Sequence, residues 1–255
     1  MHVVGLIPAR LSSTRLPEKM LLAETGKTLI QHTWEAARAT KSLDEVYVAT
    51  DSERIEFACR AVGASVIMTG EHPSGTDRIA EAMLKLPRQP DIVVNIQGDE
   101  PEMAAESVDA MVKALKEHPE ASIATPACPL YDVAKLKDPS AVKVTVTSSG
   151  RALYFSRSLI PHSRDMPIED VMEKLDGQPS PWLLHMGAYA YRREDLLRIT
   201  KLPPSKLEQM ERLEQLRALE AGMIIQIATV SGHSFGIDTP SDYAAFVARY
   251  RSSQK

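Results

Sequence analysis

Three cations follow the first apolar stretch of the chain, which reads "VVGLIP". They are Arg10, Arg15 and Lys19, and Pro17 argues against a continuous helix through them. We call residues 10–21 the cation loop. Arginine binds phosphate oxygens through paired hydrogen bonds and lysine adds a compact charge, so the loop favours a triphosphate ligand. A solvated basic loop without a ligand is the alternative.

An acidic segment, "NIQGDEP", follows the apolar run "DIVV". It places Gln97, Asp99 and Glu100 at the carboxyl end of an expected strand. A lone Asp-Glu pair after a strand is often only a turn. Beside a triphosphate, however, a carboxylate is the oxygen ligand that Mg²⁺ requires, and Mg²⁺ commonly takes one or two of them.

A second free carboxylate is found in "GIDTPSDY", near the end of the chain. Thr239, Pro240 and Asp242 form a typical helix start, with a cap, a proline in the first turn and an acid at the third position. Asp238 lies just before this helix start, so helix capping does not explain it. It is a candidate metal ligand, with an Asx turn as the alternative.

Three further motifs contain candidate binding residues. "HPSGTDR" offers Ser74, Gly75 and Thr76 before a helix, where they suit a ribose or a base edge, although simple helix capping also explains them. Arg157 in "LYFSRSLIP" and His185 with Tyr189 in "LHMGAYAYR" could bind a carboxylated sugar, yet each alone is more often structural. Glu211 and Glu214 are more often exposed helix charges.

Alternating strand and helix patterns must position these residues. Strand patterns at 3–8, 45–50, 65–69 and 91–97 alternate with helix patterns at 28–39, 51–64, 77–86 and 105–118. This rhythm predicts right-handed βαβ units and an α/β fold with a doubly wound, mostly parallel, Rossmann-like sheet, which binds ligands at the carboxyl ends of its strands. The candidate cations and carboxylates follow such strands.

The sequence pattern in the second half of the chain predicts a smaller mixed α+β lobe. Strand patterns lie close together at 122–130, 142–147 and 152–157, and a polar, proline-rich and mobile segment is expected at about 162–181. One strand is predicted over 184–192 and one long helix over 205–222. A strand at 223–230 and a helix at 239–250 follow.

Composition excludes several classes of protein. The chain has 255 residues, 44% of them hydrophobic and 25% charged, and its net charge is −4, so a general nucleic-acid or membrane binder is not expected. The two cysteines, Cys59 and Cys128, are far apart and are predicted to be buried packing residues rather than a zinc site. No apolar run approaches a membrane span, which favours a cytoplasmic protein. Neither the Walker pattern nor the dinucleotide fingerprint follows the first strand.

The motifs together resemble the CMP-Kdo synthetase family (3-deoxy-manno-octulosonate cytidylyltransferases). The similar stretches, from about residue 3 to 243 and in the family's order, are "IPAR", "STRLP", "SGTDR", "NIQGDEP", "LYFSRSLIP", "LHMGAYAYR", "LEQLRALE" and "GIDTP". The resemblance implies a nucleotidyltransferase-type fold over residues 1–255, with a CTP-binding half at about 1–120 and a sugar-binding and dimerisation half at about 121–255. It implies a bacterial cytoplasmic homodimer that uses CTP, Mg²⁺ and Kdo to make CMP-Kdo and pyrophosphate for lipopolysaccharide biosynthesis.

The same resemblance assigns roles to individual residues. Catalytic roles are implied for Arg10, Arg15, Lys19 and Asp99. Nucleotide binding is implied for Pro8, Ala9, Arg10, Lys19, Ser74, Gly75, Thr76, Arg78 and Asp99. Sugar binding is implied for Gln97, Arg157, His185, Tyr189 and Glu214, and metal binding for Asp99 and Asp238.

One departure and two alternatives accompany the resemblance. The family's cation loop commonly reads Gly-Lys-Pro, whereas this chain has Glu18, Lys19 and Met20 there. An extra carboxylate beside a triphosphate should lower the affinity unless it points outward. The alternatives are a CMP-sialic acid synthetase and a non-catalytic nucleotide-binding regulator on the same fold.

Overall fold

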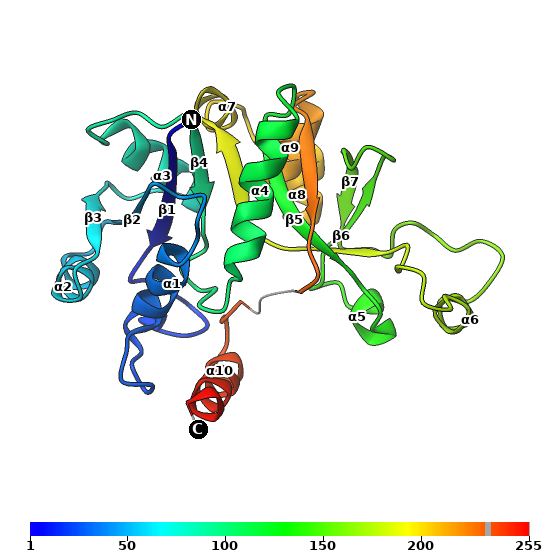
Figure 1. Cartoon of the computed structure of the whole chain (residues 1–255), viewed down its shortest axis with the longest axis horizontal. Helices are drawn as coiled ribbons and strands as arrows, with labels where there is room; N and C mark the ends of the chain where they lie inside the picture. Colours follow the sequence, from blue (N-terminus) through cyan, green and yellow to red (C-terminus); the bar gives the residue numbers. More distant parts are fainter. Residues whose placement is uncertain (233–235, 255) are drawn as a thin grey trace. The chain divides into compact units, whose positions relative to one another are not determined.

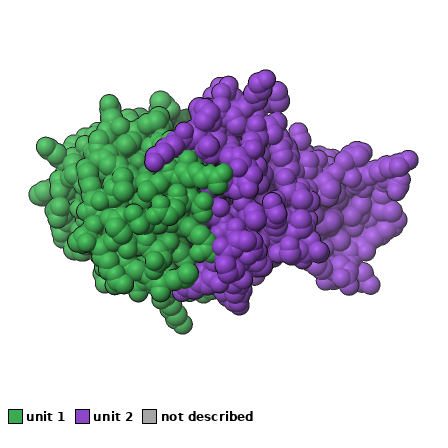
Figure 2. Space-filling model, turned by 90° about the horizontal axis from the view of Figure 1, so that it is seen from above, with its two compact units in different colours: residues 1–109, 191–200, 234–255 green, residues 110–190, 201–233 purple. Residues whose placement is uncertain are grey.

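The computed structural model describes residues 1–232 and 236–254 and separates into two compact units. Unit 1 comprises residues 1–109, 191–200 and 234–255, and unit 2 comprises residues 110–190 and 201–233 (Figure 2). The predicted division at about residue 120 stays a prediction. Unit 1 takes its last helix from the end of the sequence, which brings Asp238 into the same unit as the cation loop.

Unit 1 holds the parallel part of the sheet. Its strands lie in the order β3, β2, β1, β4, and every pair is parallel (Figure 1). The elements wholly inside this unit are β1 (Val3–Ala9), η1 (Lys19–Leu21), α1 (Leu29–Arg38), β2 (Glu45–Thr50), α2 (Glu53–Ala61), β3 (Ser65–Met68), α3 (Gly75–Leu84), β4 (Ile92–Asn95), α7 (Arg193–Ile199) and α10 (Pro240–Ser253). The helix α4 (Ala105–Glu117) and the strand β9 (Tyr189–Arg192) each contain a boundary of the units.

Unit 2 holds the mixed part of the sheet. Its strand β10 runs parallel to β5, whereas β5 and β8, β8 and β6, and β6 and β7 pair antiparallel. Its elements are β5 (Ile123–Pro129), α5 (Val133–Lys137), β6 (Lys143–Val146), β7 (Ala152–Ser156), α6 (Ile168–Glu173), β8 (Leu183–His185), α8 (Lys206–Glu211), α9 (Gln215–Glu220) and β10 (Ile225–Thr229). The predicted α/β class, a mostly parallel sheet with a mixed extension, is confirmed.

Local sequence explains where the unit 1 elements begin. The run "VVGLIPA" forms β1 and is buried along almost its whole length, as expected for a parallel strand covered on both faces. Thr28 and Ser52 cap α1 and α2 through their side chains. At α10, Thr239 and Asp242 form a reciprocal capping box and Pro240 occupies the first turn, as the sequence predicts.

Two predicted elements are wrong. The single helix over 205–222 is two short helices, α8 and α9, because Arg212 has the left-handed backbone conformation with φ 55°. The single strand over 184–192 is divided into β8 and β9, and Thr125 Oγ1 lies 2.7 Å from the Ala188 carbonyl in the interruption. Both cysteines are free and buried, as predicted.

Within the part of the chain that the structure describes, no helix is both long and apolar enough to cross a membrane.

Candidate active site

A cavity of about 400 Å³ lies in unit 1 at the carboxyl ends of β1 and β4. Its lining includes eleven residues predicted from the sequence: Pro8, Ala9, Arg10, Arg15, Lys19, Ser74, Gly75, Arg78, Gln97, Asp99 and Asp238. Segments from four separate parts of the chain therefore meet where a doubly wound sheet binds its ligand. Thr76 is buried in the first turn of α3 and does not line this cavity.

The two predicted metal ligands converge on one ammonium group. Lys19 Nζ lies 2.5 Å from Asp99 Oδ2 and 3.0 Å from Asp238 Oδ1, and it also donates to the Ile237 carbonyl at 3.0 Å. Arg15 pairs with the other oxygen of Asp238 at 2.8 Å. A cation is thus already held between two carboxylates, and the predicted grouping of Lys19, Asp99 and Asp238 is present.

Main-chain contacts and an apolar cluster hold these carboxylates together. The Ile237 amide donates to the Asp99 carbonyl at 2.9 Å, which joins the two acidic segments directly. Ile237 is fully buried in a cluster with residues of the cation loop, α1 and α10: Leu16, Leu29, Tyr243, Phe246 and Val247. Burying each such side chain stabilises the fold by about 1.5–3 kcal/mol. The position of Asp238 is therefore set by the hydrophobic core and not only by its charge.

Gly98 is a site residue that the sequence reasoning missed. A Cβ atom at this position would lie 2.9 Å from the Pro8 carbonyl oxygen and 3.2 Å from Met20 Sδ. Only glycine allows this close approach, which draws the segment bearing Asp99 against the end of β1. The signal was present in "NIQGDEP", as a glycine between the strand and the acid.

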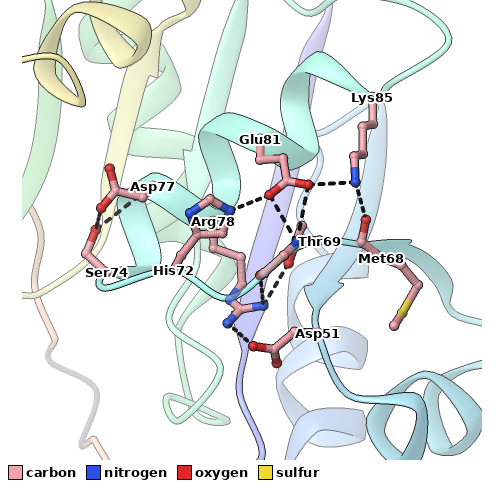
Figure 3. A network of polar contacts seen from close by, with 10 residues as sticks. Asp51, Met68, Thr69, His72, Ser74, Asp77, Arg78, Glu81 and Lys85 are labelled. Carbon is pink, nitrogen blue, oxygen red and sulfur yellow. Dashed lines mark hydrogen bonds and ion pairs between the residues drawn. The ribbon is translucent and has the colours of Figure 1, made fainter.

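Arg78 is buried, and its guanidinium forms hydrogen bonds with other side chains of the protein. It donates to Asp51 Oδ2 at 2.8 Å and to Thr69 Oγ1 at 2.7 Å, and its exposed fraction is 3%. Figure 3 shows this guanidinium beside Asp51, which follows β2, and Thr69, which follows β3. Its contact with cytidine stays a prediction. The structure shows that it braces the segment leading to Ser74.

A second carboxylate, Glu81, braces the same segment. It accepts from the Gly70 amide at 3.1 Å, pairs with Lys85 at 2.6 Å and contacts His72 Nε2 (Figure 3). The hydrogen bonds from Lys85 and His72 lower the pKa of the Glu81 carboxyl to about 2. His72, which the sequence reasoning did not select, thereby gains a fixed place in the cavity lining.

Ser74 caps α3, so the capping interpretation of this hydroxyl is confirmed. Its side chain accepts from the Asp77 amide at 3.1 Å and donates to the Asp77 carboxylate at 2.8 Å. The neighbouring Gly75 approaches Pro8, where a Cβ atom would lie 3.3 Å from the Pro8 ring. Capping does not remove these residues from the cavity, which both of them line.

Unit 2 contains four of the five predicted sugar-binding residues. The rings of His185 and Tyr189 lie 5.6 Å apart, and Phe155 packs edge-on against His185 at 4.8 Å. The Tyr189 hydroxyl donates to the Gln215 side chain at 3.0 Å, next to Glu214 at the start of α9. His185 and Tyr189 are thus brought together, whereas Gln97 belongs to unit 1.

His185 is a neutral imidazole at physiological pH. Burial lowers its pKa to about 3 because a charged ring would be desolvated. Its Nε2 lies 2.9 Å from Thr125 Oγ1, and that hydroxyl has carbonyl acceptors at Ala188 and Met186. Since the single hydroxyl proton goes to a carbonyl, Nε2 carries the imidazole proton and Nδ1 is an acceptor.

Arg157 binds main-chain carbonyls in the described structure. Its Nε donates to the Glu211 carbonyl at 2.7 Å and its NH1 group to the Pro139 carbonyl at 3.0 Å. The Glu211 carboxylate accepts from Ser156 Oγ and from the Arg157 amide. These contacts hold residue 211 at the end of α8, which explains the break at Arg212. Sugar binding by Arg157 stays a prediction.

The donor set fits a magnesium ion. Within residues 1–232 and 236–254 no group of three or more histidine, cysteine, aspartate or glutamate residues is arranged for a metal. Asp99 and Asp238 nevertheless share a bound cation, the Lys19 ammonium. Two carboxylates together with substrate phosphates are an ordinary magnesium environment.

Glu18, the residue before Lys19, does not line this cavity. Its carboxylate forms two hydrogen bonds with Arg54 of α2, at 2.5 and 2.8 Å. The hydrogen bond from Arg54 lowers the pKa of the Glu18 carboxyl, so the group is ionised at neutral pH. Lys19 still reaches the acidic segments, despite the unusual neighbour.

Comparisons with known proteins agree with this geometry. A family model described as Cytidylyltransferase matches residues 4–226. A 3-deoxy-manno-octulosonate cytidylyltransferase of Rhodopirellula baltica is 45% identical over 99% of this chain and all of its own length. An 8-amino-3,8-dideoxy-manno-octulosonate cytidylyltransferase of Shewanella halifaxensis is 41% identical over 98% of each chain.

A solved structure shares the fold nearly completely. It is a CMP:2-keto-3-deoxy-manno-octonic acid synthetase complexed with CTP, 39% identical, with a TM-score of 0.89 over 99% of this chain and all of that one. A cytidylyltransferase from Leptospira borgpetersenii, 18% identical with a TM-score of 0.60 over 97% of this chain and 86% of its own, shares the fold alone. This chain therefore belongs to the cytidylyltransferase family, and its resemblance to the CMP-Kdo synthetases within that family is confirmed.

Proposed function

We propose that this protein transfers CMP from CTP to the anomeric hydroxyl of Kdo, 3-deoxy-D-manno-octulosonate, and releases pyrophosphate. One observation carries the proposal: Asp99 and Asp238 converge on a single cation in the cavity that also holds Arg10 and Arg15. Cations for a triphosphate and carboxylates for a metal are the two parts that nucleotidyl transfer needs. The names of relatives that match nearly the whole chain support the sugar.

The residues of the chain supply positioning and charge. Arg10 and Arg15 would bind the triphosphate, and Lys19 would move from the carboxylates to the phosphates as CTP enters. The anomeric oxygen of Kdo forms a bond to the α-phosphorus while the bond between that phosphorus and the bridging α–β oxygen breaks, and pyrophosphate leaves in line. The hydroxyl proton passes to solvent.

A magnesium ion completes the proposed site. Asp99 and Asp238 would hold it, and when bound it neutralises phosphate charge and lowers the pKa of the attacking hydroxyl. A homodimer as the assembled form, the cytoplasm as the location and a role in lipopolysaccharide biosynthesis are further parts of the proposal. They come from the family resemblance.

The sugar would be recognised through hydrogen bonds rather than through a charged imidazole. Because His185 is neutral with its proton on Nε2, its Nδ1 can accept from a sugar hydroxyl but cannot pair with the sugar carboxylate. Tyr189, Arg157, Glu214 and Gln97 remain the other proposed contacts. Arg157 would therefore be the proposed partner of the sugar carboxylate.

The 8-amino sugar is a second candidate substrate. The relative from Shewanella halifaxensis named for this sugar matches 98% of the chain, and its identity of 41% lies within the 39–46% of the relatives named for Kdo. Both sugars offer the same anomeric hydroxyl and differ in the group at C8. The chemistry is the same for either one.

Pyrophosphate release tests the proposal. The protein is mixed with Mg²⁺, CTP and one of three sugars: Kdo, its 8-amino analogue or N-acetylneuraminic acid. Release that is fastest with Kdo supports the proposed function, and release that is fastest with the amino sugar moves the assignment to the second candidate. Release only with N-acetylneuraminic acid, or with none of the sugars, would refute both.

A further inference from the structure

Glu18 has a backbone conformation that is unusual for its type. Its φ of 52° and ψ of 28° lie in the left-handed region, where side chains other than glycine are disfavoured. Glycine would adopt this conformation freely. Something in the surroundings must therefore hold Glu18 in place.

Arg54 is the side chain that binds the Glu18 carboxylate. The two terminal nitrogens of Arg54 donate in parallel to the two carboxylate oxygens of Glu18, at 2.5 and 2.8 Å. This geometry fixes the direction of a carboxylate as well as its charge. The main chain of Arg54 is set by the first turn of α2, which Ser52 caps.

The direction of Glu18 matters because Lys19 is the next residue in the chain. The Glu18 carbonyl accepts from the Leu21 amide at 2.8 Å and so begins the turn η1, whose first residue is Lys19. Glu18 also borders a cavity that shares Ser12, Ser13 and Thr14 with the proposed nucleotide cavity. A carboxylate released here would add a negative charge next to the place proposed for a triphosphate.

We propose that Arg54 is a positioning residue for the cation loop: it holds the Glu18 carboxylate away from the nucleotide and so preserves the affinity for CTP. The inference rests on the proposed function for its ligand. Arg54 would act through Glu18 and touch no substrate. Both side chains are about half exposed, 58% for Arg54 and 49% for Glu18, so the pair is expected to add little to overall stability.

A double-mutant cycle separates this role from a simple loss of charge. The variants are Arg54→Ala, Glu18→Gln and the double variant. The matched control is Arg60→Ala, which removes an equally exposed arginine from the same helix, where it pairs with Glu56. For each protein the KM for CTP, the KM for Kdo and kcat are measured by pyrophosphate release. The Kd for CTP is measured by calorimetry.

The expected pattern is non-additive. Arg54→Ala should raise the KM and Kd for CTP about threefold to fivefold at low salt, because one unpaired carboxylate then repels a multiply charged ligand, and the effect should shrink in high salt. Glu18→Gln and the double variant should both stay within about twofold of the wild type, since neither has an unpaired carboxylate at residue 18. The KM for Kdo, kcat and Tm should not change.

Two results would overturn the inference. If Arg54→Ala and Arg60→Ala raised the Kd for CTP equally, the loss of any positive charge on α2 would explain the weaker binding. If the double variant bound CTP as weakly as Arg54→Ala, Arg54 would act on the nucleotide directly and not through Glu18. Should the wild type bind CTP but release no pyrophosphate with any sugar, the proposed function would fail, while the calorimetric cycle would still decide the role of Arg54.

Discussion

Lys19 Nζ lies 2.5 Å from Asp99 Oδ2, so the lysine of the cation loop and the acid after β4 form a direct ion pair. Their side chains are 11% and 26% exposed, which places the pair inside the site rather than on the outer surface. Asp238 contacts the same ammonium. The structure thus contains a lysine where the proposed function requires a metal, and the ammonium must move for CTP and Mg²⁺ to bind together.

Replacing Asp99 with Asn should abolish most activity. The variant keeps the shape of the side chain but loses the charge that would hold Mg²⁺, so kcat/KM should fall about a hundredfold or more. Pyrophosphate release over a magnesium titration measures this loss. Glu117→Gln, an exposed acid on α4, is the matched control. An Asp99→Asn enzyme within threefold of the wild type would remove Asp99 from the proposed metal site.

Replacing Lys19 with Met should leave the carboxylates of Asp99 and Asp238 without the cation that lies between them. Mg²⁺ alone should then bind between them, and about 10 mM Mg²⁺ should raise the Tm of the variant by about 2–4 °C more than that of the wild type. The KM for CTP should rise as well, because the variant lacks a phosphate-binding cation. Thermal unfolding with and without Mg²⁺ gives the comparison, with Lys113→Met as the exposed control. Equal shifts in all three proteins would argue against a shared cation position.

The neutral state of His185 predicts acid sensitivity. The pKa of the folded protein's imidazole is about 3, below its ordinary value of 6.5, so the unfolded chain takes up a proton that the folded protein does not. The stability is therefore complete above pH 6.5 and falls below it, approaching about 1.4 kcal/mol per pH unit from this group alone.

His185→Gln should remove this contribution, because glutamine can donate to Thr125 without titrating. Urea unfolding at pH values between 7.5 and 5 measures the slope for both proteins. His118→Gln, which replaces a partly exposed histidine next to Glu120, is the control for the same substitution outside the core. If His185→Gln and the wild type kept the same pH dependence, the buried imidazole would not be the cause.

The lowered pKa of Glu81 predicts that stability is also lost in a second, lower pH range. Its folded pKa of about 2 is below the ordinary value of 4.5, so the stability from its contacts with Lys85 and His72 is present above pH 4.5 and is lost as the pH falls toward 2. Glu81→Gln should cost about 1 kcal/mol at pH 7, and the difference from the wild type should shrink below pH 4.5. Urea unfolding between pH 7 and 3 tests this. A constant difference over that range would contradict it.

Local patterns were enough to predict the parallel core and the meeting of the cation loop with the two acidic segments. The strands β1 and β4 are continuous apolar runs, and the polar residues that follow them meet because parallel strands end at one edge of the sheet. Thr239 and Asp242 define the start of α10 through contacts within four residues. Such short-range signals are readable from the sequence alone.

Long-range contacts explain the features that the sequence could not predict. The helical pattern over 205–222 is strong, yet hydrogen bonds from Ser156 and Arg157 to Glu211 hold the chain where Arg212 turns left-handed. Nothing near Glu18 in the sequence indicates that Arg54, 36 residues later, directs its carboxylate. The need for glycine at position 98 likewise becomes visible only in the fold, where Pro8 and Met20 approach it.

The most direct test of the central claim is a ³¹P NMR spectrum of one reaction containing the protein, Mg²⁺, CTP and Kdo. Transfer of CMP predicts that the α-phosphorus signal of CTP is replaced by a phosphodiester signal, with pyrophosphate formed in equal amount. CDP with inorganic phosphate, or free CMP and pyrophosphate formed equally fast when Kdo is left out, would show that the site cleaves CTP without making CMP-Kdo and would contradict the account.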